Sequence, residues 1–308
     1  MQSINEFWMM WIKKIVRPYL NNQNWNIGFA ETTPQELVEN QKIGKVTWLK
    51  HPYKDRFFAD PFVYKQSDTE IVVFVEELEF GRPVGFLTEL VVDAKTKKLL
   101  RKYTLLKLDS HLSYPAIIRH NGEVLVCPEN GTTGKLTIYV YDEEHHQLHE
   151  KSVIIAESLA DATIYKHSDI YYMFATKVPK TQEDLFLYKS ARLDGDYEEV
   201  GLISQGRESS RPAGNLFTVG NTIYRPAQNC SKRYGAAVEI MKITTLNDCE
   251  YEESHCFSLI PTSFRYNLGL HTINFYEKGC VIDGYGYLYP IVGRVLHFVR
   301  KIVKSIIR

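Results

Sequence analysis

The sequence has no excess of either charge and lacks the motifs of several common functional classes. Its 37 Lys and Arg residues balance 37 Asp and Glu residues, so no overall field would attract nucleic acid. The five cysteines are odd in number and contain no Cys-x-x-Cys pair, which argues against a disulfide framework or a zinc site and favours a reducing compartment. A glycine-rich phosphate loop and a serine nucleophile elbow are also missing. No apolar run reaches the roughly 18 residues of a membrane span.

Aromatic residues, in contrast, are abundant and occur in short strand-like runs. They make up 13% of the chain, with 20 Tyr and 15 Phe. Runs rich in Val, Ile, Tyr and Phe, broken by Gly, Asn, Asp and Pro, favour β-strands over helices. Examples are Glu70–Glu77, Lys135–Asp142, Asp169–Ala175 and Asp184–Ser190. An all-β fold is therefore expected between residues 25 and 289.

An internal repeat predicts how these strands are arranged. Five similar segments are spaced 54, 47, 50 and 60 residues apart: Ala59–Val63, Ser113–Ile117, Ala160–Ile164, Ser210–Gly214 and Leu270–Asn274. A period near 50 residues, with three or four strands in each, is typical of β-propeller blades. The last repeat runs out of chain after two strands, whereas Trp25–Glu31 and Lys45–Lys50 precede the first repeat. We therefore predict a five-bladed propeller closed by its N-terminal strands, with a β-sandwich of fortuitous spacing as the alternative.

The second residue of each repeat is polar or amphipathic although its neighbours are mostly apolar. These residues are Asp60, Tyr114, Asp161, Arg211 and His271. The first strand of a propeller blade lines the central channel, where an unpaired carboxylate would be costly to bury. Two aspartates with an arginine and a histidine indicate a functional constellation; the alternative is an ion-pair network that joins the blades.

The second strand of the repeats contributes further polar candidates. Glu129 lies between a proline and an Asn-Gly turn, which places it at a constrained position beside the channel mouth. Arg225 and Gln228 follow in the fourth repeat, and Glu77 ends a strand in the first. Glu76, its neighbour, is expected to be solvated.

Two acidic or histidine-rich segments look like metal sites but favour a simpler interpretation. Asp194-Gly195-Asp196 follows a strand and reads as a hairpin loop. His145, His146 and His149 lie in an acidic polar stretch without the spacing of a closed metal site. No metal is expected.

Eight short motifs, in the same order as in a known family, carry a resemblance over residues 25–287. They are FADPFV at 58–63, SYPAI at 113–117, PEN at 128–130, DATIY at 161–165, SRPAG at 210–214, YRPAQN at 224–229, YGAAV at 234–238 and GLHTINF at 269–275. The chain resembles the N-terminal domain of plant glucosamine inositolphosphorylceramide transferases and stand-alone bacterial relatives encoded among surface-polysaccharide genes. It is also similar to five-bladed propeller furanosidases, including glycoside hydrolase family 43.

The resemblance implies carbohydrate chemistry in the channel. Asp60 would act as base or nucleophile, and Asp161 and Glu129 fall at places comparable to the other two furanosidase carboxylates. The expected blade for the acid, however, carries Arg211 instead.

Two classes of enzyme and one class of binding protein follow from this. The first is a glycosyltransferase of cell-surface polysaccharide or glycolipid biosynthesis, in which Arg211 and Arg225 hold the donor phosphate. His271 and Tyr114 would orient sugar hydroxyls, and the remaining predicted substrate-binding residues are Glu77, Gln228 and Tyr234. The alternatives are a furanosidase-like hydrolase with two carboxylates and a non-catalytic glycan-binding propeller. A nucleotide-sugar or lipid-phosphate-sugar would be the donor substrate, with a glycan or lipid-linked acceptor, and no cofactor is expected.

The two ends of the chain differ from its middle and predict membrane contact. Residues 1–24 combine aromatic and basic residues at helical spacing, without a cleavable signal peptide. Residues 290–308 place basic residues on a narrow face beside a wide apolar one, the profile of an interfacial helix on anionic lipid. We expect two amphipathic helices flanking a propeller at 25–289, and a cytoplasmic protein on the inner face of the membrane. The alternative is that both helices dock on the propeller or pair with each other.

Overall fold

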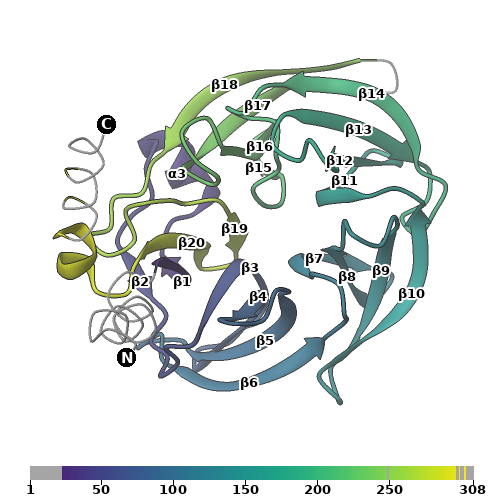
Figure 1. Cartoon of the computed structure of the whole chain (residues 1–308). Helices are drawn as coiled ribbons and strands as arrows, with labels where there is room; N and C mark the ends of the chain where they lie inside the picture. The colour runs from purple at the N-terminus through teal and green to yellow at the C-terminus, as the bar shows by residue number, and fades with distance from the viewer. Residues whose placement is uncertain (1–22, 248–249, 296–297, 299–301, 303–308) are drawn as a thin grey trace, which may run out of the picture.

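A computed structural model describes residues 23–247, 250–295, 298 and 302. In this part of the chain, five four-stranded antiparallel sheets surround a central channel (Figure 1). The predicted five-bladed propeller is confirmed.

Blades 1 to 3 follow the chain from the channel outward. Blade 1 contains β3 (Arg56–Gln66), β4 (Glu70–Glu79), β5 (Phe86–Asp93) and β6 (Leu99–Leu106); blade 2 contains β7 (Ser113–His120), β8 (Glu123–Glu129), β9 (Leu136–Asp142) and β10 (Gln147–Ile155); blade 3 contains β11 (Leu159–His167), β12 (Ile170–Lys177), β13 (Asp184–Ser190) and β14 (Glu198–Gln205). The Asp194-Gly195-Asp196 motif lies in the loop between β13 and β14, as the hairpin interpretation predicted.

Blades 4 and 5 bring the two ends of the propeller together. Blade 4 contains β15 (Phe217–Val219), β16 (Thr222–Asn229), β17 (Ala237–Leu246) and β18 (Tyr251–Leu259); blade 5 has the order β19 (Ile273–Tyr276), β20 (Gly279–Tyr287), β1 (Gln23–Ala30) and β2 (Val46–Trp48). The N-terminal strand β1 pairs with β20 from Gln23↔Tyr287 to Ala30↔Cys280. Ring closure by N-terminal strands is therefore confirmed, and it covers the outer edge of β20, which would otherwise be exposed.

One helix interrupts blade 5, and the sequence explains where it begins. In α3 (Pro34–Asn40), Thr33 caps the first turn by accepting from the backbone N–H of Glu36, whose carboxylate accepts the Thr33 N–H in return. A proline at the first helical position suits this geometry. Leu37, fully buried, anchors the helix to the core between blades 4 and 5.

Apolar layers between neighbouring blades stabilise the ring. In β4, Ile71, Val73 and Val75 pack toward blade 5, whereas Val72 and Phe74 pack toward blade 2. Because both faces of this strand are buried, its sequence is almost continuously apolar rather than alternating.

The two predicted terminal helices fall largely outside the described part of the chain. Residues 1–22, and most of the basic face predicted after residue 295, lie outside it. Residues 290–295 are helical and lie outside blade 5 (Figure 1). Among the described residues, no helix is long and apolar enough to cross a membrane.

Candidate active site

A repeated backbone irregularity turns the first strands of blades 1 to 3 toward the channel. Asp60, Tyr114 and Asp161 occupy equivalent positions and have φ values of 49°, 47° and 49°. At each, the register with the second strand shifts, between Ala59 and Phe62 in blade 1 and at the matching places in blades 2 and 3. Left-handed backbone in non-glycine residues costs about 1–3 kcal/mol and is concentrated at functional sites. The bulge aims each side chain at the channel.

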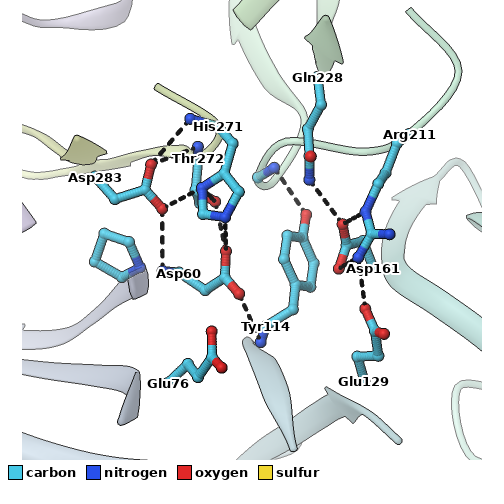
Figure 2. Close-up of polar contacts among 12 residues, drawn as sticks. Asp60, Glu76, Tyr114, Glu129, Asp161, Arg211, Gln228, His271, Thr272 and Asp283 are labelled. Atoms are coloured by element: carbon cyan, nitrogen blue, oxygen red, sulfur yellow. Dashed lines mark hydrogen bonds and ion pairs between the residues drawn. The ribbon is translucent and has the colours of Figure 1, made fainter. Parts of the chain in front are cut away.

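Asp60 lies in a dense hydrogen-bond network with blade 5 (Figure 2). Its carboxylate accepts the Thr272 hydroxyl at 2.7 Å and the Tyr114 backbone N–H at 3.2 Å. His271 Nε2 lies 3.7 Å from Asp60 Oδ1, while His271 Nδ1 lies 2.5 Å from Asp283 Oδ2. Asp283 also accepts the backbone N–H groups of His271, Thr272 and Asp60. Asp283 therefore orients the imidazole so that its other nitrogen faces Asp60.

This environment adjusts the protonation of both groups. Burial raises the pKa of Asp60 to about 6, against the charge of His271, which lowers it. The pKa of His271 is raised because the carboxylates of Asp283 and Asp60 outweigh the burial that would lower it. Near neutral pH, Asp60 is thus poised to exchange a proton.

A second cluster, across Tyr114 in Figure 2, is centred on Arg211. Arg211 donates from Nε to Asp161 at 2.5 Å and from Nη2 to Glu129 at 2.9 Å. Gln228 donates a further N–H to Asp161 at 2.8 Å. Burial raises the pKa of Asp161, whereas the Arg211 charge lowers it. Both carboxylates are therefore largely occupied by one guanidinium group.

Tyr114 joins the two clusters through its own hydrogen bonds. Its side chain is fully buried, and its hydroxyl lies 2.7 Å from the Thr163 hydroxyl and accepts the Gly214 N–H at 2.7 Å. The predicted contact with a sugar hydroxyl would have to compete with these bonds, so its observed contacts are those of a positioning residue.

Aromatic rings cover His271 and Arg211. Trp25 stacks on His271 with 3.9 Å between ring centroids, and Tyr234 meets the same imidazole edge-on at 5.3 Å. The Arg211 guanidinium lies over the Tyr234 ring at 5.2 Å. Tyr234 is exposed and touches both clusters, which suits the stacking of a sugar ring.

Two of the ten predicted site residues lie elsewhere. Glu77 is fully buried between strands, where it binds Arg56, Lys102 and the Thr88 hydroxyl. Arg225 is also fully buried, and its guanidinium binds Glu253 and the Ser209 carbonyl oxygen. The prediction that these two side chains contact substrate in the channel is therefore wrong. The other eight come together in the channel.

Glu76, like Asp283, is a channel residue that the sequence analysis missed. It was expected to be solvated, but it is 7% exposed and its carboxylate lies beside Asp60 in Figure 2. Successive residues of a strand point to opposite sides of the sheet. Glu76 therefore points toward Asp60, whereas Glu77, the next residue of β4, points to the other side. Burial, with the charges of Asp60 and Glu129, raises the pKa of Glu76 well above its ordinary value. The raised pKa makes Glu76 a candidate acid next to a candidate base, Asp60.

The pH dependence of activity should report this pair. We expect activity to rise as Asp60 loses its proton near pH 6 and to fall at higher pH when Glu76 loses its own. The Glu76→Gln variant should lack the alkaline limb and retain the acidic one, since its amide does not titrate. A kcat/KM profile measures both limbs. An unchanged alkaline limb in the variant would exclude Glu76 as the acid.

Asp60, His271 and Asp283 are also close enough to form a metal site, since their ligand atoms lie within 4.8 Å of one another. The hydrogen bonds described above already occupy both oxygens of Asp283, so these residues fit an oriented imidazole better than a metal ion. In the histidine-rich segment, His146 stacks on Tyr103 and binds Glu89, whereas His145 and His149 are exposed beside Asp142.

Fold and site together define a five-bladed propeller with a cluster of buried carboxylates in its channel. The family described as glucosamine inositolphosphorylceramide transferase 1, N-terminal, matches residues 30–266, and the chain belongs to this family. It is 27% identical over 227 residues to glucosamine inositolphosphorylceramide transferase 1 of Arabidopsis thaliana, covering 70% of this chain and 29% of that protein. The protein of the same name from Oryza sativa subsp. indica is 26% identical, with 70% and 30% covered. The chain thus spans under a third of the curated relatives it matches.

A solved structure supports the fold independently of sequence. The catalytic domain of the Coprinopsis cinerea GH62 α-L-arabinofuranosidase superposes with a TM-score of 0.54 at 9% identity. The superposition covers 72% of this chain and 78% of that domain. At this identity the likeness concerns the fold alone.

Proposed function

We propose that this chain is a glycosyltransferase of glycolipid or cell-surface polysaccharide biosynthesis, with its active site in the propeller channel. The carrying observation is the pairing of Asp60, whose pKa is raised to about 6, with the buried acid Glu76. A base and an acid side by side suit proton transfer at an anomeric centre. The named activity of the family's curated members favours transfer over hydrolysis.

Residues of the channel can carry out every proton transfer of the proposed reaction. The acceptor hydroxyl gives its proton to Asp60 as its oxygen forms a bond to the anomeric carbon of the donor sugar. The bond between that carbon and the donor phosphate oxygen breaks, and the electron pair leaves with the phosphate. Glu76 can supply a proton to the leaving oxygen, and Arg211 can stabilise its charge. Asp161 and Glu129 hold Arg211 in place, and no resident cofactor is required.

The charge of the channel limits which donors can bind. Five acidic side chains, those of Asp60, Glu76, Glu129, Asp161 and Asp283, face one arginine, Arg211, and two histidines, His111 and His271. A donor whose sugar carries a protonated amine would offset this negative charge. The relatives' name specifies glucosamine, which is such a sugar, and an amino-sugar donor is therefore included in the proposal.

A furanosidase-like hydrolase is the second candidate, because an acid and a base are sufficient for hydrolysis without a phosphate contact. A panel of nucleotide-sugars and lipid-phosphate-sugars, tested beside a simple aryl furanoside, separates the two. We expect turnover of a phosphate donor in the presence of acceptor, and no release of sugar from the furanoside. Furanoside hydrolysis alone would favour the hydrolase, and saturable binding without any turnover would favour a glycan-binding propeller.

We further propose that the protein acts at the inner face of an anionic membrane, held there by the chain after residue 290. Ile291 and Phe298 are 70% and 64% exposed, and Phe264, 64% exposed, adjoins them through its contact with Arg294. Apolar side chains in solvent beside basic ones suit the interface of a lipid bilayer, where each basic residue contributes about 1 kcal/mol.

Deleting residues 291–308 should therefore release the protein from anionic liposomes while the propeller stays folded. Co-sedimentation at low salt measures the binding, and the thermal unfolding midpoint checks the fold. Neutral phosphatidylcholine liposomes serve as the control, since they should bind neither form. A full-length protein that stays in the supernatant with anionic liposomes would contradict the proposal.

A further inference from the structure

A cavity of about 700 Å³ lies on the outer part of blade 5, apart from the channel residues. We call it the blade 5 cavity. Its lining includes Asn24 and Asn26 of β1, Trp48, His51 and the loop residues Arg265 and Tyr266. Asn24 and Asn26 alternate along β1 with Trp25, whose ring stacks on His271. One strand therefore presents one face to the channel and the opposite face to the blade 5 cavity.

The register of β1 explains why the cavity is hollow. Asn24 and Asn26 pair with Gly286 and Gly284 of β20, so no side chain of β20 projects beside either amide. A Cβ atom at Gly284 would lie 2.3 Å from the Trp48 ring, and one at Gly286 would lie 1.9 Å from the Arg265 carbonyl oxygen. The two glycines admit the indole and the 263–266 loop against the sheet, and these form the cavity wall.

Three polar atoms at the cavity are buried without a hydrogen-bond partner. They are Asn24 Oδ1, Asn26 Oδ1 and His51 Nδ1. Asn24 and Asn26 are only 4% and 2% exposed. Asn26 uses its Nδ2 group to bind the Leu49 carbonyl oxygen and the Tyr266 hydroxyl, so its unpartnered atom is the acceptor oxygen. Buried acceptors without donors are rare and costly, and a ligand with hydroxyl groups would satisfy them.

The charged and aromatic residues of the lining further limit the chemical class of the ligand. Lys45, Lys50, Lys54 and Arg265 line the cavity, and no Asp or Glu is among the described lining residues. Burial and the Arg265 charge lower the pKa of His51 to about 4, so its imidazole is neutral at pH 7. The Trp48 and Tyr266 rings lie 4.3 Å apart, tilted by 45°. Cations at the rim, acceptors inside and aromatic walls suit an anion that carries hydroxyl groups and a sugar-like apolar face.

We propose that the blade 5 cavity binds a hydroxyl-bearing phosphate, such as a sugar phosphate or the headgroup of a polyol phospholipid. Its hydroxyls donate to Asn24 Oδ1 and Asn26 Oδ1, and its phosphate lies toward Arg265 and the lysines. Leu288, at the start of the segment that leads to the exposed 290–295 helix, also lines the cavity. A ligand free in solution and a lipid headgroup are thus both sources of the same chemistry.

Binding of glucose 1-phosphate, and the preference for phosphatidylglycerol over phosphatidylserine vesicles, tests the proposal with the full chain. The two lipids carry the same net charge, so the preference excludes the general attraction of the C-terminal segment for an anionic surface. Wild-type protein should bind glucose 1-phosphate saturably, or prefer phosphatidylglycerol, or both, with affinity that falls as salt is added. Asn24→Leu should weaken that binding at least tenfold, whereas its unfolding midpoint should stay equal to or above that of the wild type, because it removes an unpartnered buried acceptor. Arg265→Glu should weaken binding by a similar factor, and Lys166→Glu, an equal charge change in blade 3, should not.

The two probes distinguish the two sources of the ligand. Loss of glucose 1-phosphate binding in Asn24→Leu identifies a soluble ligand, and loss of the phosphatidylglycerol preference in the same variant identifies a lipid headgroup. Wild-type protein with neither saturable glucose 1-phosphate binding nor that preference, or Asn24→Leu that matches wild type in both, would overturn the proposal. Because Asn24 and Arg265 line the blade 5 cavity and not the channel, loss of binding in their variants assigns the probe to this cavity, and failure of the proposed catalytic function leaves the test unaffected.

Discussion

The Asp60→Asn variant is expected to lose turnover by about 10²- to 10⁴-fold while the propeller stays folded, as removal of a general base typically does. The amide matches the shape of the carboxylate, so its oxygen can still accept the Tyr114 N–H. The Thr272 hydroxyl can rotate and accept from the new amide N–H. The charge and the site for a proton are lost. Turnover of the donor found in the panel measures the effect, with the exposed Asp169→Asn as a matched control.

The stability of the same variant separates catalysis from an ion-pair role. Because burial raises the pKa of Asp60 to about 6, the folded state retains a proton between about pH 4 and 6 that the unfolded chain has released. The contribution of Asp60 to the free energy of unfolding therefore falls as pH rises through this window. Above pH 6, Asp60→Asn should be as stable as wild type or more so. A large loss of stability there would instead indicate that Asp60 joins the blades through an ion pair with His271.

Arg211→Met is expected to destabilise the fold by about 3–5 kcal/mol at neutral pH, because it leaves the carboxylates of Asp161 and Glu129 buried without their cation. Without Arg211, the pKa of the Asp161 carboxyl group should rise further above its unfolded value, because burial then acts without the opposing charge. The folded state then binds an extra proton, so part of the lost stability should return as pH falls toward 4. Urea unfolding at pH 5 and pH 8 measures this difference.

Two other substitutions serve as comparisons for Arg211→Met. Arg192→Met breaks an exposed pair with Asp194 and should cost under about 1 kcal/mol with little pH dependence. Arg211→Lys keeps the charge but loses the planar fork, and it should weaken binding of a phosphate donor. Unchanged donor affinity in Arg211→Lys, with furanoside hydrolysis intact, would favour the hydrolase. A pH-independent loss in Arg211→Met would contradict the paired-carboxylate account.

How far the site could be predicted depended on the repeat. Five equivalent positions in five blades must converge on one axis, so the repeat was sufficient to bring Asp60, Tyr114, Asp161, Arg211 and His271 together. The choice between Glu76 and Glu77 was not available from the repeat. Both faces of β4 are buried, so its apolar pattern carries no alternation to show which glutamate faces the channel.

Contacts between residues that are far apart in the sequence could not be predicted from the repeat either. Arg225 follows the same Arg-Pro-Ala pattern as Arg211, but it faces Glu253 of β18 rather than the channel. Tyr114 was expected to meet substrate, and its hydroxyl instead accepts an N–H from Gly214, one hundred residues away. Such contacts depend on which blades become neighbours and on the rotation of each strand about its own axis.

The sequence by itself determined the all-β class, the number of blades, the closure by N-terminal strands and the ring of polar residues at the channel. These follow from local strand patterns and from a period that repeats along the chain. Only the tertiary structure decided which carboxylates share the channel, that Asp283 orients His271, and that β1 leaves two buried acceptors over a glycine pair. The physical reason is that the pKa values and unpaired hydrogen-bonding groups of a site arise from burial between blades, and burial is a property of the assembled ring.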